Sequence, residues 1–303
     1  MISYSPRFSP YFFGKLWPMK QDGKLRGKVV WITGASSGIG EQLCHACARE
    51  GADLIISARS KTKLAGVREQ VLVHGVRIAV LAFDLEKLDT LPNKVTEALA
   101  IYGRVDVLIN NAGIALKDWV TATKLEVDRK VMDINYFGPL CLTKGILPHM
   151  LERGSGQLVV ISSLSGKYGV PKISSYAASK HALHGFYETL RSEIVNSGVF
   201  ITIIIPGIIQ TEITAHALTG DGGNFGKVDK TFQRAYPADK AARKIVRAFL
   251  AKQEEVFVGG TEGITLLINR ISPWFLRRFI RNHPIKRLRK LKEFFSFKKP
   301  SGA

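Results

Sequence analysis

Seven short apolar stretches recur along the chain, and longer amphipathic segments separate them. Several of the stretches are apolar throughout, which is typical of parallel strands that are covered on both faces. Strands that alternate with helix-length segments predict an α/β fold with a doubly wound, mostly parallel sheet. The seven predicted strands are VVWIT (29–33), DLIISA (53–58), RIAVLAF (77–83), DVLINNA (106–112), QLVVISS (157–163), VFITIIIP (199–206) and EVFVGG (255–260).

One folded domain accounts for this pattern, and a shorter extension flanks it on each side. The predicted boundaries are 1–27 for the N-terminal extension, 28–262 for the domain and 263–303 for the C-terminal extension. Within the domain, 211–236 departs from the pattern because it is rich in glycine, and order resumes at Pro237. Long loops of this kind are commonly functional, so the segment predicts a mobile cover over a site.

The composition is that of an ordinary globular protein, with 46% hydrophobic residues, but the net charge of +19 is unevenly spread. Residues 270–303 hold eleven Lys and Arg against one acid, and residues 1–28 hold six against one. The region between them is therefore nearly neutral, and the basic character belongs to the two ends. The N-terminus has no apolar signal-peptide core, and no run approaches the ~18 apolar residues of a membrane-spanning helix.

The C-terminal run interleaves its cations with large apolar side chains. Trp274, Phe275 and Phe279 alternate with arginines, and apolar residues recur at helical spacing after Pro284. A basic amphipathic helix with aromatics is typical of a peripheral anchor on an anionic membrane surface. A helix that packs on the protein itself or on a partner subunit is the other interpretation, and both remain open. Nucleic acid is not expected as a partner, because bulky aliphatics accompany the cations.

The cysteines and histidines predict a reducing compartment and no metal centre. Cys44, Cys47 and Cys141 are odd in number, which argues against a disulfide framework and favours a cytoplasmic protein. Cys44 and Cys47 form a C-x-x-C, but no second pair exists to complete a metal site. The histidines, His184 among them, are predicted to be structural.

The first predicted strand runs into the glycine-rich turn TGASSGIG (33–40), which then opens a helix. Glycines at such a place allow a tight turn, and they let backbone N–H groups approach a pyrophosphate at the helix N-terminus. A position after the first strand is the context that this motif requires. The turn therefore predicts a dinucleotide site made by Gly34, Ser36, Ser37, Gly38, Ile39 and Gly40.

The end of the second strand indicates which dinucleotide binds. No acid follows it that could hold a ribose 2′-hydroxyl, whereas Arg59 could meet a 2′-phosphate with two hydrogen bonds. NADP(H) is therefore the predicted cofactor. After the third strand, Asp84 is placed to contact the adenine together with Leu85, although a helix N-cap would explain Asp84 almost as well.

The stretch SSYAASKHAL places Tyr176 and Lys180 one helical turn apart. A buried tyrosine ring with a lysine lying over it would explain the pair without any chemistry. An ammonium ~4 Å from the phenol would instead be worth ~4 kcal/mol at a dielectric of ~20, which lowers the phenol pKa from ~10. On that interpretation Tyr176 is a general acid–base, because its pKa comes within range of proton transfer.

Further motifs accompany this pair, and together they resemble the short-chain dehydrogenase/reductase family over about residues 28–260. The chain is most similar to the branch of the dehydrogenase/reductase member 7 proteins, near the 11-beta-hydroxysteroid dehydrogenases. The resemblance implies a Rossmann fold and an enzyme that interconverts C=O and CH–OH groups with a nicotinamide cofactor. The motifs that carry it are TGASSGIG (33–40), Asn110-Asn111-Ala112-Gly113, Asn135, Ser163, Tyr176 with Lys180, and Pro206-Gly207.

The resemblance also implies roles for individual residues. Tyr176 would transfer the proton, Lys180 would also hold the nicotinamide ribose, and Ser163 would hydrogen-bond the substrate oxygen. Asn135 would hold a water of a proton relay. Asn110 would seat the cofactor or tie adjacent strands together, and both alternatives remain open. The other implied cofactor residues are Ala112, Gly113, Pro206, Gly207, Ile209 and Thr211.

These features together predict an NADP(H)-dependent oxidoreductase that acts on an apolar carbonyl or alcohol, such as a lipid, a steroid or a retinoid. A 3-oxoacyl or 3-ketosphinganine reductase is the alternative within this class. A catalytically silent, nucleotide-binding protein at a membrane is the alternative of another class, and the intact catalytic positions argue against it. Assembly into a dimer or tetramer is expected.

Overall fold

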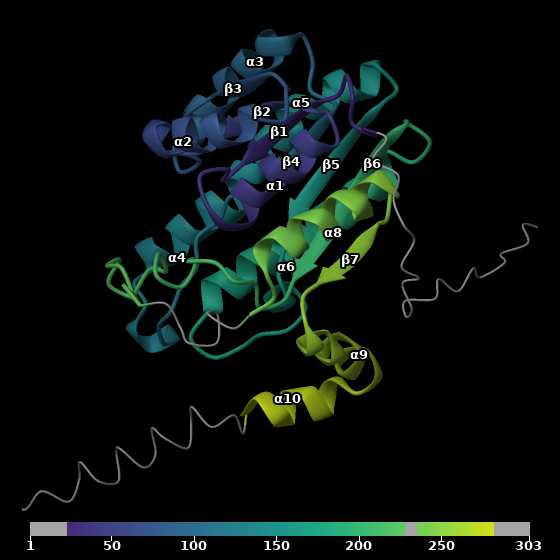
Figure 1. Cartoon of the computed structure of the whole chain (residues 1–303). Coiled ribbons are helices and arrows are strands. Elements are labelled where there is room, and N and C mark those ends of the chain that lie inside the picture. The colour runs from purple at the N-terminus through teal and green to yellow at the C-terminus, as the bar shows by residue number, and fades with distance from the viewer. Residues whose placement is uncertain (1–22, 228–234, 282–303) are drawn as a thin grey trace, which may run out of the picture.

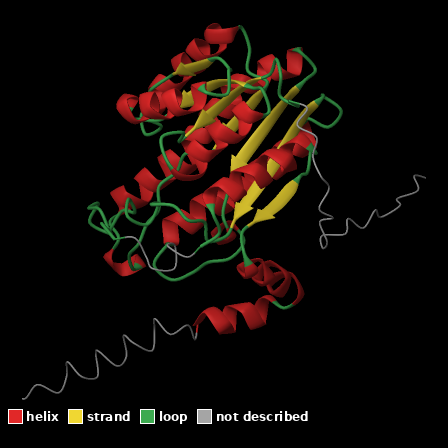
Figure 2. Ribbon diagram, viewed as in Figure 1, coloured by secondary structure: helices red, strands yellow, loops and turns green. Residues whose placement is uncertain are grey.

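A central sheet with helices on both faces forms the body of the protein (Figures 1 and 2). The computed structural model describes residues 23–227 and 235–281. The sheet has seven strands in the order β3-β2-β1-β4-β5-β6-β7, and each neighbouring pair is parallel. The predicted doubly wound sheet is confirmed, and it is parallel throughout.

The strands are short and largely buried, which explains why their sequences are apolar on both faces. The chain runs from β1 outward to β3 and then crosses back to β4, so the strand order reverses between β1 and β4. Doubly wound folds bind ligands outside the carboxyl ends of the strands at such a reversal. The strands are β1 (Val29–Thr33), β2 (Asp53–Ser57), β3 (Ile78–Val80), β4 (Val107–Asn110), β5 (Gly156–Ile161), β6 (Val199–Pro206) and β7 (Glu255–Val258).

Two apolar cores lie on opposite faces of the sheet. Val30 and Ile32 of β1 join the core under α1, α2 and α8, whereas Val29 and Trp31 join the core under α3, α5 and α6. The alternation follows from the two-residue period of a strand. The helices are α1 (Gly38–Arg49), α2 (Lys61–Leu72), α3 (Leu91–Tyr102), α4 (Leu125–Met132), α5 (Gly138–Glu152), α6 (Ser174–Glu193), α8 (Ala238–Leu250), α9 (Ile264–Ile271) and α10 (Pro273–Arg281).

The helical stretch between β4 and β5 contains a turn that the sequence pattern does not reveal. A π turn, Asp133–Phe137, joins α4 to α5. Turns of this kind are rare and occur frequently at functional sites. Asn135 lies within it and is fully buried.

The two extensions differ in how they relate to the body. Leu25 is buried in the core under α1, and its backbone N–H donates to Glu50 O at 2.9 Å. Helices α9 and α10 instead project from the body as a C-terminal lobe (Figure 1). Among the helices of residues 23–227 and 235–281, none has the length and apolarity needed to span a bilayer. The apolar repeat predicted after Pro284 lies outside the described residues.

Candidate active site

The glycine-rich turn after β1 is packed too tightly to accept side chains. Gly34 and Gly38 have φ values of 65° and 58°, which glycine adopts without steric cost. A Cβ on Gly34 would lie 2.7 Å from the Cα of Ala112, and one on Gly40 would collide with the carbonyl of Gly34. The side chain of Ser37 does not cap helix α1. The first N–H groups of α1 are therefore placed to meet an anion.

Asn111, a motif residue for which the sequence predicted no role, fixes this turn to the end of β4. Asn111 donates from Nδ2 to Thr33 O at 2.9 Å, and Thr33 Oγ1 accepts from the backbone N–H of Asn111 at 3.0 Å. Asn110 points to the other face and donates from Nδ2 to Thr143 Oγ1 and Tyr187 OH, at 3.0 and 2.9 Å. The observed bonds of Asn110 thus tie β4 to α5 and α6. The Asn-Asn pair on an alternating strand was the available signal.

Ser163 and Tyr176 meet at the carboxyl end of β5. Ser163 follows that strand, and its Oγ accepts a hydrogen bond from the backbone N–H of Ser165 at 3.1 Å. Tyr176 lies in the first turn of α6, and its hydroxyl is close enough to that of Ser163 for Ser163 to influence the pKa of Tyr176. The predicted pair of hydroxyl groups is therefore close in space although it is thirteen residues apart in sequence.

Lys180 and Asn135 lie beside this pair, and both are buried. Lys180 donates from Nζ to Ile161 O at 2.8 Å, and Nζ lies 5.7 Å from the centre of the Tyr176 ring. Asn135 bonds both backbone groups of Ile114, accepting at 2.8 Å and donating at 2.9 Å. A Cβ on Gly113 would lie 3.1 Å from Asn135 Oδ1 and 3.5 Å from Lys180 Nζ. The lack of a side chain at Gly113 thus lets these two groups converge.

The comparisons with known proteins decide the family. The family described as short chain dehydrogenase matches residues 28–221. The chain belongs to the short-chain dehydrogenase/reductase family. It is accordingly an oxidoreductase that acts on CH–OH and C=O groups with NAD(P).

Individual relatives agree with this assignment. The chain is 42% identical, over 85% of its length and 82% of the other, to a Drosophila melanogaster protein named "Dehydrogenase/reductase SDR family protein 7-like". A metagenomic short-chain oxidoreductase in complex with NADP is 28% identical, with a TM-score of 0.65 over 78% of this chain and 98% of that one. A Burkholderia phymatum enzyme in complex with NAD is 22% identical, with a TM-score of 0.72 over 82% and 93%, and shows the fold alone.

The predicted lowering of the Tyr176 pKa does not appear in the structure described, where the net shift is upward and Lys180 is not among its causes. Burial raises the pKa of Tyr176 above its ordinary value, and the Ser163 hydroxyl only partly offsets it. Burial also lowers the pKa of Lys180 to about 8. The prediction placed a charged ammonium ~4 Å from the phenol. The sequence does not reveal how far both groups are removed from water, and burial dominates here.

Arg59 follows β2 and Asp84 follows β3, so both lie past the carboxyl ends of these strands. Arg59 is exposed and lines a cavity of about 330 Å³ together with Lys130 and His216. Asp84 Oδ1 accepts from the backbone N–H of Glu86 at 3.1 Å, so it closes a local turn. Leu85 is only 6% exposed and packs in the core under α3. The side chain of Leu85 therefore faces the core and not the crevice.

The residues at and after the carboxyl end of β6 contact β7 and the start of α1. Gly207, directly after Pro206, donates its N–H to Val258 O at 2.9 Å, which fixes the strand end to β7. Thr211 lies over the start of α1, because a Cβ on Gly38 would be 3.1 Å from its Cγ2. Ile209 is buried in the core under α1, so its side chain does not reach the crevice.

The described part of the glycine-rich segment, 211–227, is fastened over the site by backbone hydrogen bonds. Leu218 donates to Ala115 O at 2.8 Å and accepts from Lys117 N–H at 2.9 Å. Gly220 donates its N–H to Asp118 Oδ2 at 2.9 Å. The segment thereby closes a small apolar cluster, against which Ile114 and Tyr176 pack. The buried members of that cluster are Leu116, Val127, Val131 and Leu218.

Proposed function

We propose that this protein is an NADP(H)-dependent carbonyl reductase of apolar substrates, with Tyr176 as the proton donor. The observation that carries the proposal is the juxtaposition of Tyr176 with a hydrogen-bonding hydroxyl and an apolar wall. The hydroxyl of Tyr176 lies close to that of Ser163, and Tyr176 packs against the cluster that includes Leu116 and Leu218. A carbonyl oxygen placed at the two hydroxyl groups would leave an apolar substrate body against these side chains.

The residues of the crevice fit a dinucleotide. The turn at Gly34, Gly38 and Gly40 leaves no room for a Cβ at its two ends, and the start of α1 offers N–H groups to a pyrophosphate. Thr211 lies over the start of α1. Thr211 and Lys180 would hold the nicotinamide end. When bound, the cofactor supplies the hydride for the carbonyl carbon.

Arg59, which follows the second strand, favours NADP(H) over NAD(H). Arg59, Lys130 and His216 line one cavity, and no described acid forms an ion pair with Arg59. A 2′-phosphate can accept two hydrogen bonds from a guanidinium, whereas a 2′-hydroxyl offers no charge. Arg59 is therefore the residue that would distinguish the two cofactors.

The raised pKa of Tyr176 suits the reductive direction. A phenol whose pKa lies above its ordinary value keeps its proton at neutral pH and can donate it to a developing alkoxide. Ser163 would stabilise the same oxygen through its hydroxyl group. Lys180, whose pKa of about 8 is close to neutrality, would restore the proton to the phenol. Asn135 fixes the Ile114 backbone beside Lys180 and orients this corner of the site.

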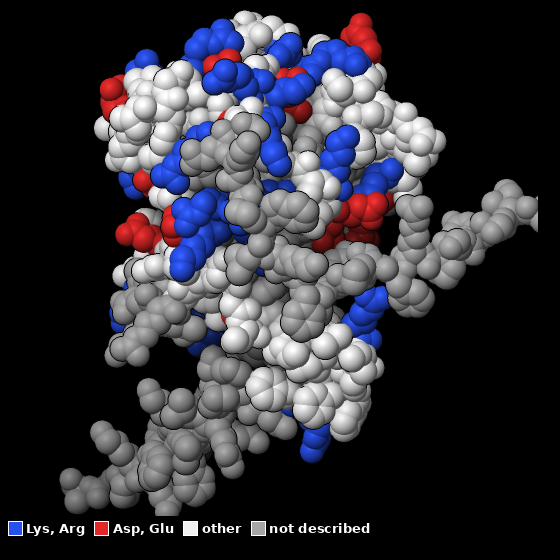
Figure 3. Space-filling view, turned by 45° about the vertical axis from the view of Figure 1, so that its right-hand side comes forward, with Lys and Arg blue, Asp and Glu red and all other residues white. Residues whose placement is uncertain are grey.

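The C-terminal lobe supports a location at a membrane surface. Trp274, Phe275 and Phe279 of α10 are 67%, 53% and 61% exposed, and Ile271 of α9 is 74% exposed. The described surface at the lower right of Figure 3 is mainly uncharged, with few basic side chains. Aromatic and aliphatic side chains beside arginines gain free energy from an anionic lipid interface.

The lobe is also joined to the active-site turn. Tyr168, which follows the turn that begins at Ser163, shares a hydrogen bond of 2.7 Å with Thr265 of α9. Asn269 of the same helix donates to Lys167 O at 3.2 Å. Contact between lipid and the lobe would hold the site close to a source of apolar ketones, which dissolve poorly in water.

Cofactor consumption with a panel of carbonyl compounds tests the proposal. Purified full-length protein is mixed with NADPH or NADH and with steroid, retinoid, long-chain and short polar ketones, a 3-oxoacyl thioester and 3-ketosphinganine. We expect NADPH to be consumed with the apolar ketones and the matching alcohol to form in equal amount. Consumption only with acyl thioesters or ketosphinganine would favour the more specialised reductases. Binding of NADPH without turnover of any ketone would contradict the proposal.

A further inference from the structure

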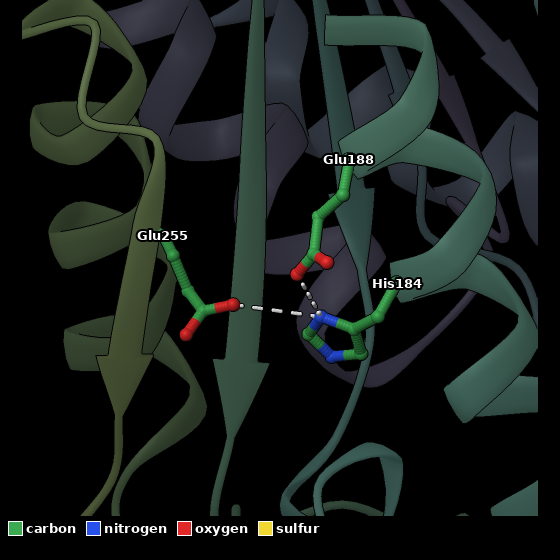
Figure 4. Close-up of side chains that lie close together, drawn as sticks. All are labelled: His184, Glu188 and Glu255. Carbon is green, nitrogen blue, oxygen red and sulfur yellow. Dashed lines mark ion pairs between the residues drawn. The ribbon is translucent and has the colours of Figure 1, made fainter. Parts of the chain in front are cut away.

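A second group of chemically active side chains lies between α6 and the start of β7. His184 and Glu188 are one turn apart on α6, and Glu255 begins β7 (Figure 4). One ligand atom from each of the three lies within 4.8 Å of the others. His184 lies eight residues after Tyr176 on the same helix, and the proposed reaction does not use the group.

The imidazole of His184 is the feature that points to a ligand. Its side chain is 8% exposed, and its Nδ1 atom is buried without a hydrogen-bond partner. Figure 4 shows the ring directed at both carboxylates. Nδ1 lies 3.5 Å from Glu255 Oε2 and 3.8 Å from Glu188 Oε1, which is too long for a hydrogen bond. A buried nitrogen without a partner is costly, so the arrangement calls for a group between the three atoms.

The opposite ring nitrogen has a hydrogen-bond partner. Nε2 of His184 lies 2.9 Å from Ser162 Oγ, and in the tautomer that carries its proton on Nε2 it donates to this oxygen. Nδ1 then carries a lone pair. Ligating histidines characteristically donate their other N–H to a fixed oxygen in this way. Three electron-pair donors thus converge, two of them on carboxylates.

We propose that His184, Glu188 and Glu255 bind a divalent transition-metal cation of the zinc class. In a tetrahedral site with bonds of ~2.1 Å the ligand atoms lie ~3.4 Å apart. The two distances from Nδ1, 3.5 and 3.8 Å, are close to this value. One imidazole and two carboxylates suit zinc, cobalt or nickel, and water completes the coordination. The side chain of Glu188 is 53% exposed, so a small rotation brings it to the required distance.

Lys167 now supplies positive charge to this group. Its Nζ lies 2.7 Å from Glu255 Oε2 and 3.9 Å from Glu188 Oε1. Lys167 is 24% exposed and attached by a flexible stem, so a dication can displace it toward solvent. The bound cation would fix the edge strand β7 to α6. It would also hold Ser162, which directly precedes Ser163.

Titration of the full chain with Zn²⁺, without any affinity tag, tests the site. We expect one equivalent to bind, Co²⁺ to give the absorption of a tetrahedral complex, and Glu188→Gln to weaken binding at least tenfold. Glu212→Gln is the matched control, because Glu212 and His216 form a similar pair one turn apart on the exposed surface. That substitution should leave the affinity unchanged.

Lys167→Met separates the metal site from a plain ion-pair network of a protonated His184 with the two glutamates. Removal of the competing ammonium should tighten Zn²⁺ binding about tenfold if the cation replaces it. The ion-pair network predicts no site in either protein. Zinc held at other surface residues, such as the neighbouring His45 and His74, would bind Glu188→Gln as well as the wild type. Either of these results would overturn the proposal.

Discussion

The carboxyl edge of the sheet buries polar side chains, whereas the C-terminal lobe exposes apolar ones. At the edge, Asn135 and Lys180 are only 0% and 4% exposed, and each is hydrogen-bonded to the backbone. In the lobe, Trp274 and Phe279 are 67% and 61% exposed. Buried polar groups specify one arrangement, whereas exposed apolar groups gain free energy only when a partner covers them. The edge therefore holds its polar groups in one fixed arrangement, and the lobe leaves apolar side chains that a partner surface would stabilise by covering them.

The largest effect is expected from a methyl group added to the glycine-rich turn at the carboxyl edge. We expect Gly40→Ala to lower NADPH affinity by more than ~100-fold, because the new Cβ collides with the carbonyl of Gly34 and distorts the cradle. Gly66→Ala in α2 is the control, since a Cβ there meets nothing within 4 Å. It should leave affinity unchanged. Fluorescence titration with NADPH measures both, and similar affinities for the two variants would contradict the assigned cradle.

The second test concerns the cost of burying Lys180. Burial lowers its pKa from 10.5 to about 8, so the unfolded chain binds more protons than the folded one between these values. The penalty on folding is therefore complete below pH 8 and disappears as the pH rises toward 10.5. We expect the stability of the wild type, relative to Lys180→Met, to rise by about 2 kcal/mol between pH ~7 and ~9.5.

Urea unfolding at the two pH values measures this difference. Lys63→Met, which changes an exposed lysine of α2, is the control and should follow the wild type at both. If the difference in free energy of unfolding between the wild type and Lys180→Met were the same at both pH values, the Lys180 ammonium would not be desolvated.

The sequence predicted the sheet, its parallel strands and the turn around Gly34 because each has a local pattern. It also selected Ser163, Tyr176 and Lys180, which the fold brings to one edge. It could not predict the π turn at Asp133–Phe137, because the spacing of apolar residues along a helix hardly changes when one turn contains an extra residue. Nor could it give the acidity of Tyr176, which depends on burial by segments far apart in the chain.

Selection by motif also passed over residues with no distinctive pattern. Asn111 was named within a motif but given no role, although its amide binds the glycine-rich turn whereas that of Asn110 binds Tyr187. His184 was predicted to be structural, and that stays a prediction. Glu255, which lies near it, is seventy-one positions away in the sequence, so the sequence could not reveal this contact. The assembly into dimers or tetramers stays a prediction.

The third prediction concerns Arg59 and the choice between NADPH and NADH. We expect Arg59→Leu to weaken NADPH binding by about 2 kcal/mol, roughly 30-fold, because one charge-assisted contact to phosphate is lost. NADH binding should hardly change, and it serves as the control in the same protein. Isothermal titration with both cofactors decides the point. Equal losses would assign Arg59 to folding instead of phosphate recognition.

The fourth and smallest effect concerns the lobe. We expect the triple variant Trp274→Ser, Phe275→Ser and Phe279→Ser to bind anionic liposomes about tenfold more weakly, because less apolar surface enters the interface. The double variant Val73→Ser and Val120→Ser removes exposed side chains of the body and should bind as the wild type does. Co-sedimentation measures the bound fraction. Equal binding by all three proteins would assign membrane contact to another part of the chain.

The central claim is that Tyr176 gives its proton to the carbonyl oxygen, and a single turnover tests it most directly. Protein loaded with NADPH is mixed with an apolar ketone, and loss of nicotinamide absorbance is followed before product release. The account predicts that Tyr176→Phe binds NADPH normally but reacts at least ~10³-fold more slowly than the wild type. A first turnover at more than a tenth of the wild-type rate would contradict it.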